Sequence, residues 1–173
     1  MPNTYTLISS NILSSSAGTV TFSSIPATYT DLMLLASIRT SQAGVNNGTA
    51  TLTFNGDTAA NYGVTSINAY GSGGNTGNST GLSGISLNSG ALNSAGHLAD
   101  TFTHHEMYIA SYKESGYKTF MMQTAGEDNV TSVYMGIQAG LWSNSAALTS
   151  ITYTCGGNFV SGSSFYLYGI KNS

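Results

Sequence analysis

The residues best suited to metal chemistry gather in one segment, positions 97–106. This segment holds His97, Asp100, His104, His105 and Glu106, and imidazole and carboxylate groups are common ligands of transition metals. In a β-strand, however, successive side chains point to opposite faces, so only His104 and Glu106 would share a side. We therefore interpret these residues as polar groups at a strand entrance or a subunit contact, and we expect no metal site.

The remaining carboxyl groups could form the acid–base pair of a glycosidase, which needs two of them at a defined separation. The candidates are Asp57, Glu114, Glu127 and Asp128, and each stands among turn-forming residues. Nothing in their spacing sets two of them apart, and such carboxylates are usually solvated loop groups. The chain also lacks a nucleophile-elbow, phosphate-loop or dinucleotide motif. We therefore expect no catalytic residues, no cofactor and no enzymatic activity.

The single tryptophan offers a different kind of chemistry, which is binding. Trp142 lies in the sequence AGLWSN, where it follows an apolar strand pattern and opens a loop. An exposed indole could stack on a sugar ring, as aromatic platforms do in lectin-like modules. A large aromatic residue at this place also suits a plug that closes one end of a core. We predict the plug and keep the sugar platform as an alternative.

Charge is scarce, which restricts the partners of the protein. Charged residues make up 6% of the chain, the formal net charge is −3, and the basic residues are Arg39, Lys113, Lys118 and Lys171. Nucleic-acid binding normally needs a basic stripe that neutralises phosphates, so we expect no nucleic-acid partner. Weak net charge also removes the repulsion that keeps monomers apart, which favours a protein packed in an assembly.

Cys155 is the single cysteine, so the chain has no intrachain disulfide. It follows Ile151 and Tyr153 at every second position, and we expect it on the buried face of a strand. No apolar run approaches the roughly 18 residues of a membrane span. The N-terminus also lacks the charged and then apolar segments of a signal peptide. We expect neither a signal peptide nor a membrane-embedded segment.

Strand patterns recur from end to end, and no stretch carries a sustained helical pattern. In Thr49–Asn55, Ala50, Leu52 and Phe54 alternate with polar residues, whereas Asp31–Arg39 is apolar at both parities, which predicts a central strand covered on both sides. The predicted fold is an all-β, antiparallel sandwich of jelly-roll type with about ten strands, in a single domain over residues 1–173. The other expected strands are Thr4–Ser9, Gly18–Ser24, Val64–Tyr70, Leu82–Leu87, His104–Ala110, Lys118–Thr124, Val130–Ala139, Leu148–Cys155 and Ser164–Ile170.

Two segments are candidates for contacts with other subunits. Gly71–Gly96 is rich in Gly, Ser and Asn, and we expect a loop or an arm that orders against a neighbour, with Leu82, Ile85 and Leu87 as its apolar contacts. Pro2–Ile8, which includes Pro2 and Tyr5, could add a strand to the sheet edge of a neighbouring subunit through main-chain hydrogen bonds.

Four stretches of the chain have a recognisable pattern: MPNTYTLISSNIL, VTFSSIPATYTDLMLLASIRT, LTFNGDTAANY and AGLWSNSAALTSITYTCGGNFVSGSSFYLYGI. Together they resemble structural proteins of tailed-phage virions, including capsid decoration proteins of cyanophage type. The resemblance is strongest around Ile25–Leu32, Phe54–Asp57 and Trp142–Asn144, and it covers nearly the whole chain except the Gly/Ser-rich middle. It implies a compact jelly-roll sandwich and brings no catalytic residues with it.

The resemblance and the composition together lead to one expected function and one alternative. The expected function is a capsid decoration, or cement, protein on the outer surface of the virion, which binds the major capsid protein as a homotrimer. Such a protein stabilises the assembled shell by mass action, because it binds the assembled lattice alone. The alternative is a tail or tail-fibre module that binds host surface glycans through Trp142 and the Tyr- and Asn-rich loops.

Overall fold

The computed structural model describes residues 4–43, 48–71, 73–87, 92–127 and 133–171. All regular secondary structure in these residues is β. The strands are β1 (Tyr5–Ile12), β2 (Ala17–Phe22), β3 (Asp31–Ile38), β4 (Ala50–Phe54), β5 (Tyr62–Tyr70), β6 (Gly73–Leu82), β7 (Ile85–Ser86), β8 (Thr103–Ile109), β9 (Lys118–Glu127), β10 (Val133–Trp142), β11 (Ile151–Phe159) and β12 (Ser164–Ile170).

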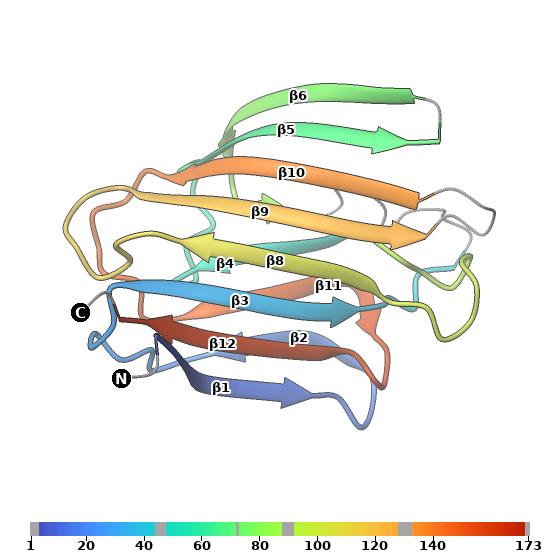
Figure 1. The fold of residues 1–173 in the computed structure, drawn as a ribbon, viewed down its shortest axis with the longest axis horizontal. Coiled ribbons are helices and arrows are strands. Elements are labelled where there is room, and N and C mark those ends of the chain that lie inside the picture. The colour runs from blue at the N-terminus through green and yellow to red at the C-terminus, as the bar shows by residue number, and fades with distance from the viewer. Residues whose placement is uncertain (1–3, 44–47, 72, 88–91, 128–132, 172–173) are drawn as a thin grey trace.

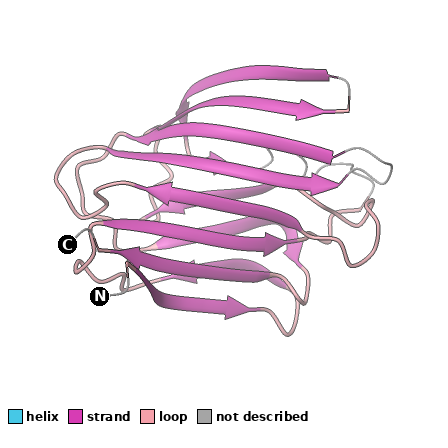
Figure 2. Ribbon diagram, in the orientation of Figure 1, coloured by secondary structure: helices cyan, strands magenta, loops and turns pink. Residues whose placement is uncertain are grey.

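The strands form two antiparallel sheets of unequal size (Figure 1). The large sheet has eight strands in the order β1-β12-β3-β8-β9-β10-β5-β6, and the small sheet has four in the order β2-β11-β4-β7. The predicted antiparallel sandwich is confirmed, and Figure 2 shows strands and loops throughout the described residues. The jelly-roll connectivity stays a prediction. Within the described ranges, no helix is long and apolar enough to cross a bilayer.

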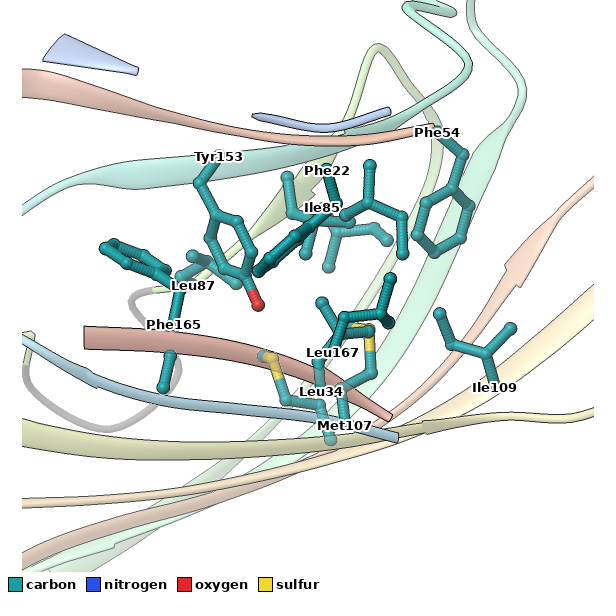
Figure 3. Close-up of a cluster of buried hydrophobic side chains, with 14 of the residues drawn as sticks. Phe22, Leu34, Phe54, Ile85, Leu87, Met107, Ile109, Tyr153, Phe165 and Leu167 are labelled. Atoms are coloured by element: carbon teal, nitrogen blue, oxygen red, sulfur yellow. The ribbon is translucent and has the colours of Figure 1, made fainter. Parts of the chain in front are cut away.

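The core lies between the two sheets, and alternation along each strand builds it (Figure 3). Ala50, Leu52 and Phe54 of β4 point inward and are at most 3% exposed. They belong to the same core cluster as inward side chains of the large sheet, such as Leu34 and Phe165. The strand β4 ends in the turn expected from the sequence, where Asn55 and Gly56 adopt φ values of 52° and 66°. The predicted burial of Cys155 is also confirmed.

The strand β3 differs from its prediction in one respect. Its inward residues, including Leu32, Leu34 and Ile38, are buried in the core as expected. Its other face, with Met33 and Leu35, is only half-buried, and no second layer covers it in the described part of the chain. The expectation that β3 is covered on both sides is therefore wrong for a single chain. The apolar residues at alternate positions of β3, such as Met33 and Leu35, therefore do not contribute to the core of this chain.

The Gly/Ser-rich segment is part of the sandwich, which corrects the expectation of a loop or arm. β6 pairs with β5 from Tyr62–Leu82 to Tyr70–Gly73, and its residues before Leu82 were not predicted as a strand. β7 falls within the expected strand Leu82–Leu87, so β6 is the additional strand that brings the count in the described residues to twelve. The sequence missed β6 because Gly, Asn and Ser have low strand propensity, so backbone pairing with β5 decides its structure.

The apolar contact candidates of this segment lie inside the protein. Ile85 and Leu87 are at most 1% exposed and belong to the core, whereas Leu82 is half-buried against it. Burial excludes Ile85 and Leu87 from a surface contact. Tyr5 belongs to β1 and pairs with Ile170 of the same chain, so the N-terminal strand completes its own sheet. Pro2 lies outside the described residues.

A substitution at Gly140 of β10 tests the packing of side chains between the strands of the large sheet. A Cβ atom at this position would lie 1.9 Å from Cζ of Phe120, which is 4% exposed and packs edge-on against Phe54. Gly140→Ala should therefore lower the free energy of unfolding by about 2 kcal/mol, through overpacking. Urea denaturation measures this change. Gly116→Ala is the control, because a Cβ there meets no atom within 4 Å; equal stability of the two variants would contradict the packing.

Candidate functional site

The His and carboxylate cluster is separated by the two faces of β8, as the sequence predicted. His104 and Glu106 share the outer face, with 4.0 Å between Nε2 and Oε2. His105 points inward and is 2% exposed, while the Nδ1 atom of His97 accepts a hydrogen bond from the backbone of Ser94 at 3.0 Å. Among the described residues, no three His, Cys, Asp or Glu side chains lie close enough to hold a metal ion.

Asp57 proves to be a structural group that fixes the position of Trp142. One carboxylate oxygen accepts hydrogen bonds from Trp142 Nε1 at 2.8 Å and from Asn61 Nδ2 at 2.9 Å, and the other accepts one from the backbone N–H of Ala59. Asn61 first, and then Trp142 and Ala59, lower the pKa of Asp57 to about 2. Because these bonds stabilise the ionised form, the carboxylate serves as an acceptor rather than as a proton donor.

Trp142 is fully buried, so the predicted core plug is confirmed. Its ring stacks on Tyr62, with 6.4 Å between centroids, and packs edge-on against Phe54 at 5.6 Å. An indole with no exposed surface cannot present a face to a sugar. The alternative of a glycan platform at Trp142 is therefore wrong.

The other candidate carboxylates also serve the fold or stand alone. Glu127 accepts hydrogen bonds from the hydroxyl of Thr101 at 2.9 Å and from the backbone of Leu98 at 3.2 Å. Glu114 is exposed in the loop between β8 and β9, and its backbone carbonyl accepts a hydrogen bond from Lys118. Asp128 lies outside the described residues. The described carboxylates form no pair across a cleft.

Two of the four basic side chains are buried and hold loops in place. The guanidinium group of Arg39 donates to the backbone carbonyls of His97 at 2.9 Å and Thr101 at 3.1 Å. The Nζ atom of Lys118 donates to the carbonyls of Glu114, at 2.7 Å, and Gly116, and burial lowers the pKa of this amine. These charges are satisfied inside the protein, which leaves the surface even poorer in charge than the composition indicates.

Most of the exposed large apolar side chains of the described residues lie on the outer face of the large sheet, which we call the front face. The small sheet covers the other side, and Figure 1 views the front face directly. Cross-strand partners run across it as a row from Leu7 through Tyr168, Met33, Tyr108 and Met121 to Ala139. The parallel row contains Tyr166, Leu35, Glu106, Gln123, Ile137 and Ile67.

Large apolar side chains on the front face are exposed to an unusual degree. Leu7 and Met121 are 51% exposed, Met135 is 46% exposed, and Ile67 is 62% exposed. A shallow hollow of about 350 Å³ lies between Tyr5, Met33, Leu35, Glu106 and Tyr168. Monomeric soluble proteins rarely expose contiguous apolar patches of this kind, and such patches mark interaction sites.

The strand β10 shows that the exposure of the front face is a property of the fold. Its apolar set of Val133, Met135 and Ile137 points outward, while the alternate positions Gly136 and Gln138 are buried. This is the reverse of the usual rule that the more apolar side of a strand faces the core. The sequence alternation identified this set of residues, but it could not show that the set lies outside.

The outer face of the small sheet follows the usual pattern, with polar side chains facing solvent. It carries two rows of threonines, Thr19–Thr154–Thr51 and Thr21–Thr152–Thr53, and the hydroxyls of Thr21 and Thr152 lie 3.0 Å apart. Both outer faces belong to antiparallel sheets with the same core between them. The contrast between them therefore identifies the front face as the one adapted to burial.

The front face has few charges and enough area for a specific protein contact. Beside the His104–Glu106 pair, Asp31 accepts hydrogen bonds from the hydroxyl of Tyr108 at 2.6 Å and from the backbone of Ser111. The bond to Asp31 raises the pKa of Tyr108 to about 12. Eight strands of seven to ten residues, about 4.8 Å apart and with a rise of about 3.3 Å per residue, give roughly 1,000 Å². A standard interface buries about 800 Å² on each partner.

Comparisons with protein-family models, curated proteins and solved structures gave no match. The signals that pointed to the front face in the sequence were the apolar residues at both parities of β3 and the scarcity of charge.

The burial of His105 predicts that the protein loses stability at acidic pH. Burial, together with the neighbouring His104, lowers the pKa of His105 from 6.5 to about 3, and neither ring nitrogen has a hydrogen-bond partner. Its cross-strand neighbours, Ala36 and Thr124, do not titrate. Between pH 6.5 and 3 only the unfolded chain binds this proton. The free energy of unfolding therefore decreases as the pH is lowered through this range, and the loss is about 2 kcal/mol at pH 5.

Urea denaturation at pH 7 and pH 5 measures this loss in the wild type and two variants. His105→Leu should remove most of the difference between the two pH values, whereas His104→Gln, which changes the exposed neighbour, should retain it. An unchanged difference in His105→Leu would refute the assignment.

Asp57→Ala tests the link between this carboxylate and the plug. The substitution removes the acceptor of the indole N–H, which leaves a buried donor without a partner. Stability should fall, and the fluorescence of Trp142, the single tryptophan, should shift to the red as water reaches the indole. Glu114→Ala removes an exposed carboxylate and is the control. Identical spectra for Asp57→Ala and the wild type would show that Asp57 does not position the ring.

Proposed function

We propose that this protein is a structural protein of a tailed-phage virion, a decoration protein that binds the outer surface of the capsid through its front face. The observation that carries the proposal is the front face itself, an apolar and almost uncharged sheet surface that the chain's own small sheet does not cover. The resemblance of the four sequence stretches supplies the class of partner, the major capsid protein.

The physical chemistry of the front face suits a contact that is repeated many times on a shell. A protein that binds only the assembled lattice stabilises it by mass action, and many copies make a modest affinity at each site sufficient. Contacts through methionine, leucine, isoleucine and tyrosine avoid the desolvation cost of buried ions. The threonine rows on the opposite face would then remain in contact with water. The homotrimer expected from the sequence stays a prediction.

A charge placed on the front face should abolish capsid binding. The double variant Met135→Lys and Ile137→Lys introduces two ammonium groups at exposed positions of β10, so folding should be retained. Each buried, unpaired charge costs several kcal/mol, and we expect affinity for capsids that lack the protein to fall at least roughly hundredfold. Co-sedimentation with purified capsids measures the change.

The matched control is Thr51→Lys with Thr154→Lys, which adds the same charge to the threonine face. Wild-type binding by the front-face variant, or an equal loss in the control, would contradict the proposal. Quantitative mass spectrometry of virions tests position independently. Hundreds of copies support the capsid, whereas a few dozen at most would favour the tail and overturn the decoration role.

A further inference from the structure

The large sheet ends on two strands that are exposed along nearly their whole length. β1 and β6 are the outermost strands, and each has one hydrogen-bonded neighbour in the described residues, β12 and β5 respectively. All residues of β6 except Leu82 are exposed, as are all residues of β1 except Ile8. The outer side of each strand therefore presents backbone N–H and C=O groups to its surroundings. Figure 1 shows the two strands at opposite ends of the sheet.

These edges lack most of the features that prevent pairing with other chains. Soluble proteins usually protect an edge strand with charged residues, proline, bulges or a covering element. β6 (GGNTGNSTGL) and β1 (YTLISSNI) contain no charged residue and no proline. β1 has one irregularity, between Leu7 and Ser9, and β6 shows a register shift only near its end, between Tyr62 and Val64 of its partner. Because neither strand carries a charge, β1 of one copy and β6 of another would not repel each other electrostatically.

The composition of β6 indicates that pairing on its outer side would stabilise it. Its side chains bury almost nothing, and glycine weakens a strand because it loses more backbone entropy on ordering. The described contacts of β6 are therefore mostly its hydrogen bonds to β5. Because Leu82 is the one β6 side chain that packs against the core, the strand gains little stability from its own side chains. A second hydrogen-bonded neighbour would supply the missing support.

The directions of the strands make a second copy of this chain the fitting partner. All seven pairings in the large sheet are antiparallel, and the number of strands is even, so β1 and β6 run in opposite directions. A second copy placed beside the first in the same orientation brings its β1 next to β6 of the first, and the two strands are antiparallel. The sheet would continue without a break in its alternation.

We propose that copies of this protein associate edge to edge, with β6 of one copy paired to β1 of the next. This joins the two segments that the sequence marked for subunit contacts, which the fold places at opposite edges of one sheet. The contact is heterologous, so it generates a ring or a filament. The predicted homotrimer would be the three-membered ring. The inference concerns a surface other than the front face and does not depend on the proposed function.

Cross-linking between two single-cysteine variants tests which edges meet. Ser10→Cys on β1 and Asn78→Cys on β6 are exposed and lie on the same side of the sheet, opposite Tyr166 and Thr65 respectively. Both are made in a Cys155→Ala background and mixed with a short bismaleimide. The mixed species should form much faster than either cross-linked homodimer. Predominant β1–β1 or β6–β6 products, or no cross-link, would overturn the inference.

A charged edge provides the second test. Thr76→Lys with Asn78→Lys places two charges on β6 without touching the core, and light scattering should show a shift from oligomer to monomer across a concentration series. The control is again Thr51→Lys with Thr154→Lys, which should remain oligomeric. A monomeric wild type, or a variant with unchanged mass, would refute edge pairing. Loss of capsid binding by the front-face variant with an intact oligomer separates this result from the proposed function.

Discussion

The unequal size of the two sheets is the constraint on which the rest of the molecule depends. A sheet of four strands packs against a sheet of eight, and burial of the apolar side chains between them provides the main driving force for folding. The aromatic contacts of Phe54, Tyr62, Phe120 and Trp142 close one end of this core. The front face and the strands β1 and β6 lie outside this core, so its burial of apolar side chains stabilises them little. The surfaces available for contact are therefore a direct consequence of the layer arrangement.

The few ionisable groups are placed so that they support this architecture. Arg39 and Lys118 direct their charges to backbone carbonyls of loops, and Asp57 accepts the N–H of the buried indole. A buried charge is tolerated only when its hydrogen-bonding capacity is satisfied, which these contacts achieve. As a result, the outer surfaces carry hydroxyls, amides and apolar groups more than charges. Such surfaces associate through packing and backbone hydrogen bonds, with weak dependence on salt.

The two proposed contacts use different parts of the same sheet and different chemistry. The front face offers side chains, and association there would bury apolar area. The edges offer backbone groups, and association there would extend a hydrogen-bonded ladder. The two contacts are roughly perpendicular, so one copy could dock on a shell and join its neighbours at the same time. This combination is what a protein repeated over a large surface requires, and it needs no reactive site.

The sequence by itself determined the class of fold, most strand positions and the structural place of Trp142 and Cys155, because alternation and turn residues are local signals. It failed at β6, whose residues have weak strand propensity and become a strand only by pairing with β5. It also gave the wrong environment for the outer side of β3 and left the outer side of β10 undecided. Alternation shows that a strand has two different faces, but it cannot show which face a second sheet covers. Only the tertiary structure decided that Met33, Met135 and Ile137 lie outside, because the four-stranded sheet packs against the opposite face.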